Sequence, residues 1–483
     1  MNALYVPAAI AIYFVLLYVI SRWAGGKGNN DAFFRAHRRS PWWVVAFGML
    51  GASISGVSLV SVPGLVLTQD MTYMQLCVGF FFGYLVVAFV LLPIYYKWNL
   101  TSIYTYLNIR FGPSAYRTGA AFFFLSKLLG MSVRLYLICL ILHRLLFDGT
   151  SIPFVLVVTG VVLLIWGYTA RGGVKSLVWT DAWQTLCLLS ALLLIAYRLC
   201  QLNGFTVSEA VDYITNHEYG RWLEWEDWTS PQHFLKQVLS GIFIVVVMTG
   251  LDQDAMQKNL TCKSVRDAQK DMCSYGFFFL PLNWLFLSVG VLMIAFAQNE
   301  GIALPKNSDE ILPMLCQSGY LGQDVFWLFF LGLMAATFSS ADSALTALTT
   351  TCCIDLLDIE KREKGQEQIR KKVHFLLSIL MIPVIVMIHL LNHTSVIDAI
   401  YVLASYTYGP LLGMFAFGIF TRRMPQIKMI PWVALAAPLV TLLLQRMALR
   451  MDYHFGYELL LLNGGLTYAG LYMLSFCQDR NKK

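Results

Sequence analysis

The chain has 483 residues, of which 58% are hydrophobic and 13% are charged, and its mean hydropathy is +0.62. These values exclude a soluble globular protein, because such a protein has no need of so much apolar surface. The formal net charge of +7 does not require a nucleic-acid partner, since basic residues of membrane proteins gather in cytoplasmic loops and attract anionic lipid.

Apolar runs of about 20 residues, the length that crosses a bilayer, recur along the whole chain. The first run has no basic residue before it, and we interpret it as a retained membrane helix rather than a signal peptide. The sequence predicts an all-α polytopic membrane protein with one transmembrane domain over 1–483. Thirteen spans are expected, at 4–22, 44–68, 75–97, 117–143, 153–169, 176–198, 237–256, 273–298, 325–355, 373–391, 396–420, 429–446 and 458–476.

The loop charges predict the orientation of these spans. With the N-terminus outside, the inside segments contain 26 of the 35 Lys and Arg residues, and the outside loops contain seven. So strong a bias follows the positive-inside rule. It predicts a cytoplasmic C-terminus, in a plasma membrane or a bacterial inner membrane.

Helix breakers concentrate in the second and seventh spans. The second span contains Gly51, Gly56 and Pro63, and the seventh contains Gly241 and Gly250. Each glycine alone also fits close helix packing, but together they match a transporter built from two inverted five-helix repeats, each with a broken first helix. We expect the repeats at about 44–198 and 237–420, with peripheral helices at 4–22, 429–446 and 458–476.

Two predicted spans carry carboxylates with hydroxyl neighbours. Ser339, Asp342 and Ser343 share one face of the ninth span, and Asp181 opens the sixth. Isolated hydroxyls often bond back to their own helix, and a carboxylate is also favourable at a helix N-terminus. Intramembrane carboxylates nevertheless mark functional sites by default, and hard cations prefer such oxygen ligands.

Four motifs resemble the sodium:solute symporter family in order and spacing, along nearly the whole chain. They are Gly51-Ala52-Ser53-Ile54-Ser55-Gly56, Gly172-Gly173 followed by Trp179-Thr180-Asp181, Gly250-Leu251-Asp252-Gln253, and Ser339-Ser340-Ala341-Asp342-Ser343.

The resemblance implies bound sodium. One ion is expected between the second and ninth spans, held by the carbonyls of Gly51, Ile54 and Ala336 and the hydroxyls of Ser339 and Ser340. A second cation site, present in a subset of the family, would use Asp181, Ser339, Asp342 and Ser343. Characterised two-sodium members often have Ser where Asp342 stands, so a tighter cation site and a proton site both remain open.

The stretch from Gly250 to Leu260 resembles the family motif Gly-x-x-Gln-x-x-x-Gln-Arg-x-Leu, with Lys258 in place of the Arg. The resemblance implies that Gly250, Gln253 and Gln257 gate and anchor the seventh span. Without the resemblance, this stretch reads as a solvated helix end.

The expected substrate site centres on Arg134, which lies within a span. An intramembrane Arg either forms a structural ion pair or captures a substrate carboxylate, and the sialic-acid branch of the family has an Arg at a comparable position. Lys127, seven residues earlier, is expected to extend toward the cytoplasm. Plausible companions of Arg134 are Ser55, Ser58 and Gln75.

A hexose is not expected as the solute. The family's sugar branch uses Asn and Tyr where this chain has Val245 and Met248, which cannot supply those hydrogen bonds. The predicted solute is therefore an organic anion, with sialic acid among the candidates.

The predicted function is sodium-coupled secondary active symport, importing this solute by alternating access. The alternatives are a proton-coupled symporter, motivated by Asp342, and a non-transporting membrane sensor. No Walker loop, nucleophile elbow, zinc-spacing histidine pair or haem motif occurs, so no enzyme is predicted. The expected partners are the solute, sodium and membrane lipid, with no obligate protein partner.

Overall fold

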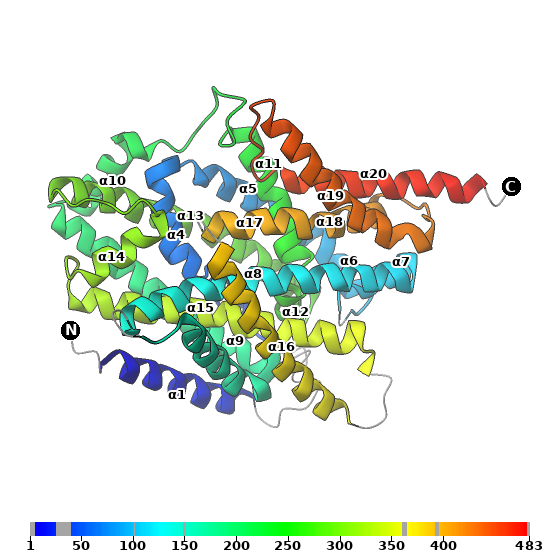
Figure 1. The fold of residues 1–483 in the computed structure, drawn as a ribbon, viewed down its shortest axis with the longest axis horizontal. Helices are drawn as coiled ribbons and strands as arrows, with labels where there is room; N and C mark the ends of the chain where they lie inside the picture. Colours follow the sequence, from blue (N-terminus) through cyan, green and yellow to red (C-terminus); the bar gives the residue numbers. More distant parts are fainter. Residues whose placement is uncertain are drawn as a thin grey trace.

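A computed structural model describes residues 5–25, 40–100, 102–147, 151–359, 365–391 and 396–480, and most of these residues are helical. Long helices lie side by side along the horizontal axis of Figure 1, with α1 at the left and α20 ending at the right. The helices of ten or more residues are α1 (Tyr5–Gly25), α3 (Trp42–Ser53), α4 (Gly56–Gln69), α5 (Tyr73–Val86), α8 (Pro113–Phe147), α9 (Phe154–Leu202), α10 (Val207–Asn216), α11 (Phe234–Val245), α13 (Val265–Asn299), α15 (Gln323–Thr351), α16 (Gln366–Leu391), α17 (Val396–Thr407), α18 (Gly409–Phe420), α19 (Ile430–Leu449) and α20 (Leu459–Arg480).

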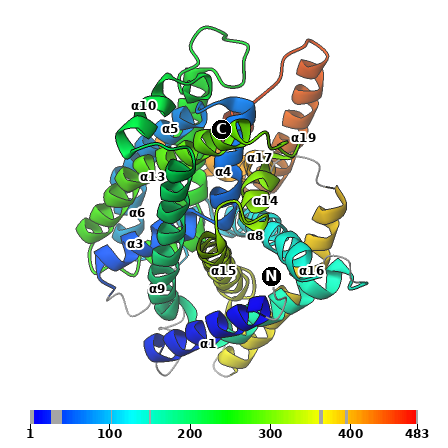
Figure 2. The same ribbon diagram turned by 90° about the vertical axis from the view of Figure 1, so that its left-hand side faces the viewer.

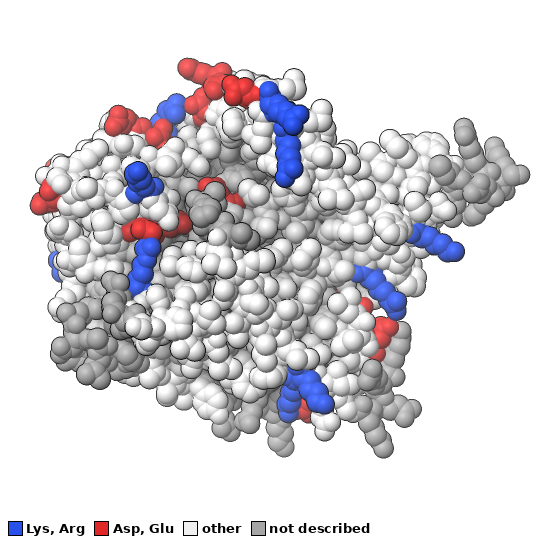
Figure 3. All heavy atoms as spheres, in the orientation of Figure 1, with Lys and Arg blue, Asp and Glu red and all other residues white. Residues whose placement is uncertain are grey.

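Shorter helical elements connect or extend these helices. They include the π-helical turns η2 (Val87–Leu91), η4 (Val246–Gly250) and η6 (Cys352–Leu356), and the α-helices α6 (Leu92–Lys97), α7 (Thr105–Phe111), α12 (Gln253–Asn259) and α14 (Ile311–Gln317). In the face shown by Figure 3, charged side chains lie mainly around the rim, and the centre is largely uncharged. An uncharged surface of this kind suits contact with lipid.

The length and composition of the described helices allow eight to eleven membrane spans, the larger number counting each of three bent pairs as one span. Two shorter apolar helices, Ile10–Ile20 and Phe154–Gly167, fall on two further predicted spans. The all-helical fold class is confirmed, whereas the count of thirteen stays a prediction.

Both predicted breaks occur. The axes of α3 and α4 differ by 55°, and the chain passes from one to the other through Ile54 and Ser55. The second break separates η4 from α12, with an angle of 68°. A third break of 48° divides the predicted 396–420 span into α17 and α18. This break was not predicted, although Gly409-Pro410 is a helix-breaking pair at that point.

The predicted spans 153–169 and 176–198 belong to one helical segment, α9, with no non-helical residue between them. The two halves nevertheless run in opposite directions. The first half runs against α16, since Phe154 meets His389 and Thr169 meets His374; the second runs against α15, since Asp181 meets Ser339 and Arg198 meets Asp324. Because α15 and α16 are themselves antiparallel, with Thr349 bonded to His374, α9 reverses between these halves. The two predicted spans are therefore antiparallel to each other, although no non-helical residue separates them.

Helix α15 forms the centre of the molecule (Figure 2). Every residue from Gly332 to Thr351 is buried, including the polar cluster from Ser339 to Ser343. It packs against the first half-helix α3, the second half-helix α4, and α8, α9 and α16. The polar residues of α15 are thereby held beside the first break and not in contact with lipid.

Candidate functional site

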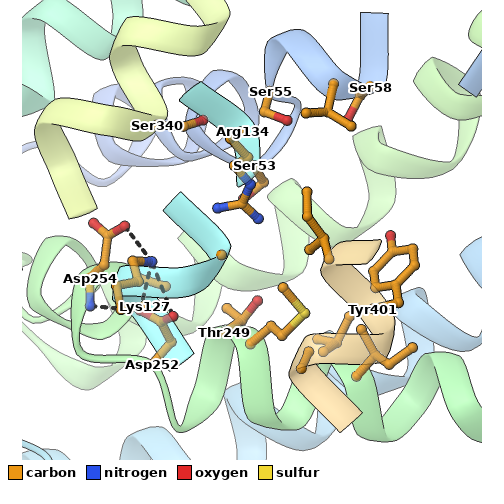
Figure 4. Close-up of a pocket in the computed structure, with 18 of the residues that line it drawn as sticks. Ser53, Ser55, Ser58, Lys127, Arg134, Thr249, Asp252, Asp254, Ser340 and Tyr401 are labelled. Atoms are coloured by element: carbon orange, nitrogen blue, oxygen red, sulfur yellow. Dashed lines mark hydrogen bonds and ion pairs between the residues drawn. The ribbon is translucent and has the colours of Figure 1, made fainter. Parts of the chain in front are cut away.

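A cavity of about 130 Å³ lies between the two breaks. The first break lines it with Ser53, Ser55 and Ser58, and the second with residues that include Thr249 and Asp252. Helix α8 contributes Lys127 and Arg134, and α15 contributes Ser340 (Figure 4). The molecule thus brings together four of the segments that the sequence analysis singled out.

The residues predicted for the first sodium ion lie where α15 meets the α3–α4 break. A Cβ atom added to Gly56 would meet the side chain of Thr337 and lie 3.2 Å from the carbonyl oxygen of Leu333. The break therefore approaches α15 closely, one turn before Ser340. The Ser340 hydroxyl donates to the Ala336 carbonyl over 3.2 Å, so two of the predicted ligand oxygens are already neighbours. Carbonyl and hydroxyl oxygens of this kind suit a hard cation such as sodium.

Gly51 is placed on the other side of the same break. A Cβ atom there would lie 3.0 Å from the Cα atom of Thr185 and closer still to its side chain. The glycine thus lets α3 lie against α9. A backbone carbonyl could be supplied by any residue at position 51, but the close packing against Thr185 requires glycine.

The four residues predicted for a second cation lie together, and both carboxylates among them are fully buried. The Ser339 hydroxyl donates to Asp181 Oδ1 at 2.6 Å, and the Ser343 hydroxyl donates to Asp342 Oδ1 at 3.3 Å. A fifth residue joins them: Lys258 Nζ lies 2.8 Å from Asp181 Oδ2. The sequence analysis treated Lys258 only as a replacement for an arginine, because sequence alone gave no sign that α12 turns back toward α9.

The side chain of Lys127 ends in a group of ion pairs at the start of α12. Its side chain is 9% exposed, and its Nζ lies 3.1 Å from Asp252 Oδ2 and 2.8 Å from Asp254 Oδ2. The Tyr408 hydroxyl also donates to Asp252, at 2.6 Å. The buried Asp252 and the half-buried Asp254 thus hold the ammonium group in an ion pair, whereas the sequence predicted a side chain that reaches the membrane edge. These contacts tie the start of α12 to α8.

The residues predicted to gate the second break act as anchors for neighbouring elements. The Gly250 carbonyl accepts from the Tyr95 hydroxyl at 2.7 Å, and Gln253 Oε1 accepts from the Ile103 amide at 3.0 Å. Gln257 Nε2 lies within hydrogen-bonding distance, 3.3 Å, of Thr350 Oγ1 on α15.

Three of the four predicted substrate residues line the cavity: Ser55, Ser58 and Arg134. Gln75 does not. Its amide donates to the Gln232 carbonyl at 2.9 Å and accepts from the Glu224 amide at 3.0 Å. It therefore fastens α5 to the segment that precedes α11.

The sequence analysis missed the aromatic wall of the cavity. Phe80 and Tyr84 come from α5, Tyr275 and Phe279 from α13, and Tyr401 from α17. The first two pairs are each spaced four residues apart, which places both members on one helix face. That spacing is the signal that could have found them.

The guanidinium of Arg134 points into the cavity, between the serines of the first break and Thr249 (Figure 4). Among the residues that the structure describes, Arg134 forms no hydrogen bond or ion pair, and its buried Nε has no partner. The two other cations in the cavity wall, Lys127 and Lys258, are both paired with carboxylates.

Residues 33–427 match the sodium:solute symporter family. The chain is 24% identical over 462 residues to the sodium/sialic acid symporter NanT of Aliivibrio fischeri, a match that covers 92% of this chain and 86% of NanT. It is 24% identical over 405 residues to the human sodium/iodide cotransporter, covering 82% of this chain and 62% of that protein. The structure of a substrate-bound, outward-open Na⁺-coupled sialic acid symporter superposes with a TM-score of 0.80 at 19% identity, covering 97% of both chains.

The fold and the match define a membrane transporter with the broken-helix architecture, not an enzyme. The chain belongs to the sodium:solute symporter family. Its class of activity is sodium-coupled symport of a small solute across a membrane.

Proposed function

We propose that this chain imports an organic carboxylate together with sodium and that Arg134 binds the carboxylate. The observation that carries the proposal is the contrast among the three cavity cations: Lys127 and Lys258 each form an ion pair with an aspartate, and Arg134 forms none among the described residues. An unpaired charge inside a membrane protein is costly. A carboxylate that enters the cavity supplies the missing partner through a bidentate contact.

Sialic acid is the first candidate for this carboxylate. The relatives named for sialic acid and iodide both carry anions. Val245 and Met248 line the cavity, which places apolar groups where a hexose would need hydrogen bonds. The aromatic wall offers surfaces on which the apolar face of a sugar acid can lie.

Sodium coupling follows because the first sodium site and the solute site both use the α3–α4 break. A sodium ion held by the carbonyls of Gly51, Ile54 and Ala336 and by the hydroxyls of Ser339 and Ser340 would brace the first break against α15. Ser55 and Ser58 belong to the same break and face the solute. Fixing the break therefore prepares the solute site, and by linkage the solute must tighten sodium binding equally. Release of sodium would remove the brace and permit the opposite face to open.

The proposal places the N-terminus outside and the C-terminus in the cytoplasm of a plasma membrane or bacterial inner membrane. The positions of α1 and α20 fit termini on opposite sides of the membrane, since α1 begins at one end of the long helices and α20 ends at the other (Figure 1). We further assign the inverted repeats to about 44–198 and 237–420. Membrane lipid is the expected surrounding, and no obligate protein partner is required.

The test is uptake of labelled sialic acid into proteoliposomes with and without an inward sodium gradient. Arg134→Gln should raise the KM about 10- to 100-fold, because hydrogen bonds to charged groups contribute about 1.5 to 3 kcal/mol. Arg144→Gln is the matched control on the same helix, since Arg144 is half-exposed and pairs with Glu310 at the surface. Sodium-independent uptake, or an unchanged KM in Arg134→Gln, would contradict the proposal.

If sialic acid gives no uptake, thermal unfolding of the purified protein screens other organic acids. A ligand that binds only the folded protein stabilises it by RT ln(1 + [L]/Kd). The proposal expects carboxylates to stabilise wild type more with sodium than with potassium, and the effect to disappear in Arg134→Gln. Stabilisation by glucose but by no acid would instead favour a sugar transporter.

A further inference from the structure

The geometry around Asp181 points to a tethered cation. We propose that the ammonium of Lys258 occupies the second cation position and that the transport cycle therefore couples one sodium ion instead of two. This inference deepens the proposed function, because it specifies the sodium stoichiometry of that symport.

Both carboxylate oxygens of Asp181 are already engaged. Oδ2 lies 2.8 Å from Lys258 Nζ, and Oδ1 accepts the Ser339 hydroxyl at 2.6 Å. The side chains of Lys258 and Asp181 are only 4% and 1% exposed. The chain's own ammonium group thus pairs with Asp181, one of the four residues that the resemblance to two-sodium members assigns to a second ion.

The surrounding charges favour this position for the ammonium. Asp254 Oδ1 lies 3.8 Å from Lys258 Nζ, and the charge of Asp342 also acts on Lys258. Three carboxylates therefore surround one lysine in the interior of a membrane protein, where an uncompensated charge is expensive. A free sodium ion on Asp181 would have to displace the ammonium or lie beside it, and two like charges at that separation repel.

A tethered cation differs from sodium in one consequence for transport. Sodium leaves toward the cytoplasm and releases the energy of its gradient, whereas the ammonium of Lys258 remains on α12. The second position then contributes no ion to the cycle. Symport of one sodium ion with one monovalent carboxylate moves no net charge, so a membrane potential should not drive it.

The test counts sodium ions by equilibrium binding of ²²Na⁺ to the purified protein, without any solute. Wild type should bind one ion per chain. Lys258→Gln exposes Asp181 and should bind two, and the Lys258→Gln/Asp181→Asn double variant should return to one. Lys258→Arg keeps a tethered positive charge and should bind one ion. Size-exclusion profiles establish that each variant is folded.

Two results would overturn the inference: two ions bound by wild type, or one ion bound by a folded Lys258→Gln protein. If Lys258→Gln does not fold, the double variant decides, because it removes both charges together. It should bind as many ions as wild type, and the loss of one ion would show that Asp181 held free sodium.

The same experiment separates this inference from the proposed function. Wild type that binds no sodium would refute the sodium site at the first break. A sodium ion gained in Lys258→Gln and lost again in the double variant would still support the tethered cation. In proteoliposomes, a potassium–valinomycin potential should leave wild-type uptake unchanged and accelerate uptake by Lys258→Gln.

Discussion

The two broken helices face one cavity, but they present different chemistry to it. The break between α3 and α4 exposes only neutral groups, the backbone carbonyls and the hydroxyls of Ser53 and Ser55. The break before α12 is followed by Asp252, Asp254 and Lys258, all paired with charges from α8 or α9. Interrupting a helix frees backbone groups in both places. The side chains then decide whether the break can hold a mobile ion or is fastened by ion pairs.

This difference suggests a division of roles. A site of neutral oxygens can lose a sodium ion without leaving a buried charge uncompensated; the Ser340 hydroxyl, for example, has the Ala336 carbonyl as its hydrogen-bond partner. A buried ion pair is costly to break once it has formed, since each partner is left uncompensated. The first break is thus suited to ion exchange, and the second to holding α12 in a defined position.

The largest loss of stability should come from removing a charge at the second break. Lys127→Ala leaves Asp252 and Asp254 without their nearest cation and should destabilise the protein by about 3 to 5 kcal/mol. Lys371→Ala is the control, because the Lys371–Glu367 pair lies on an exposed helix face and such pairs contribute about 0.5 kcal/mol at most. Denaturant unfolding of the purified proteins measures both. Equal losses would mean that the second break is not fastened by its ion pairs.

A smaller loss of stability is expected when a side chain is added at the first break. Gly51→Ala adds a methyl group that meets Thr185 on α9, and overpacking of this kind costs about 1 to 3 kcal/mol. Since the Gly51 carbonyl is a proposed sodium ligand, the same variant should raise the sodium concentration needed for half-maximal uptake. Gly160→Ala is the control, because a Cβ atom there meets nothing within 4 Å. Unchanged stability and an unchanged sodium response in Gly51→Ala would mean that α3 can move away from α9 at no cost.

The sequence predicted the elements that depend on local patterns. Apolar runs located the helices, and the glycines at 51, 56 and 250 located two breaks, because both signals act over a few residues. The third break was missed at Gly409-Pro410, where a long apolar run concealed a breaker pair. No local pattern indicates that the two antiparallel halves of α9 form one helical segment.

The charge pairings lay beyond what sequence could supply. Lys127 and Asp252 are 125 residues apart, and Lys258 and Asp181 are 77 apart. Their meeting depends on the 68° turn at the second break, which brings α12 against α15, α3 and α9 and within reach of Lys127 on α8. No local pattern fixes such an angle. The prediction for Gln75 failed for the same reason. Gln75 is a polar residue within a span, but it fastens α5 to the 224–232 segment and does not line the cavity.

The smallest expected effect is on sodium binding, and it tests the α3–α4 break most directly. Ser340→Ala removes one hydroxyl among five proposed sodium ligands and should cost about 1 kcal/mol of sodium binding, or roughly fivefold in the sodium requirement. Ser405→Ala is matched to it, since the buried Ser405 hydroxyl likewise donates to the carbonyl four residues earlier, on α17. Uptake at varied sodium separates the two, and both proteins should unfold at nearly the same temperature. If Ser405→Ala shifts the sodium requirement as much as Ser340→Ala, the effect comes from lost helix bonding. The result would then give no support to a sodium site at the first break.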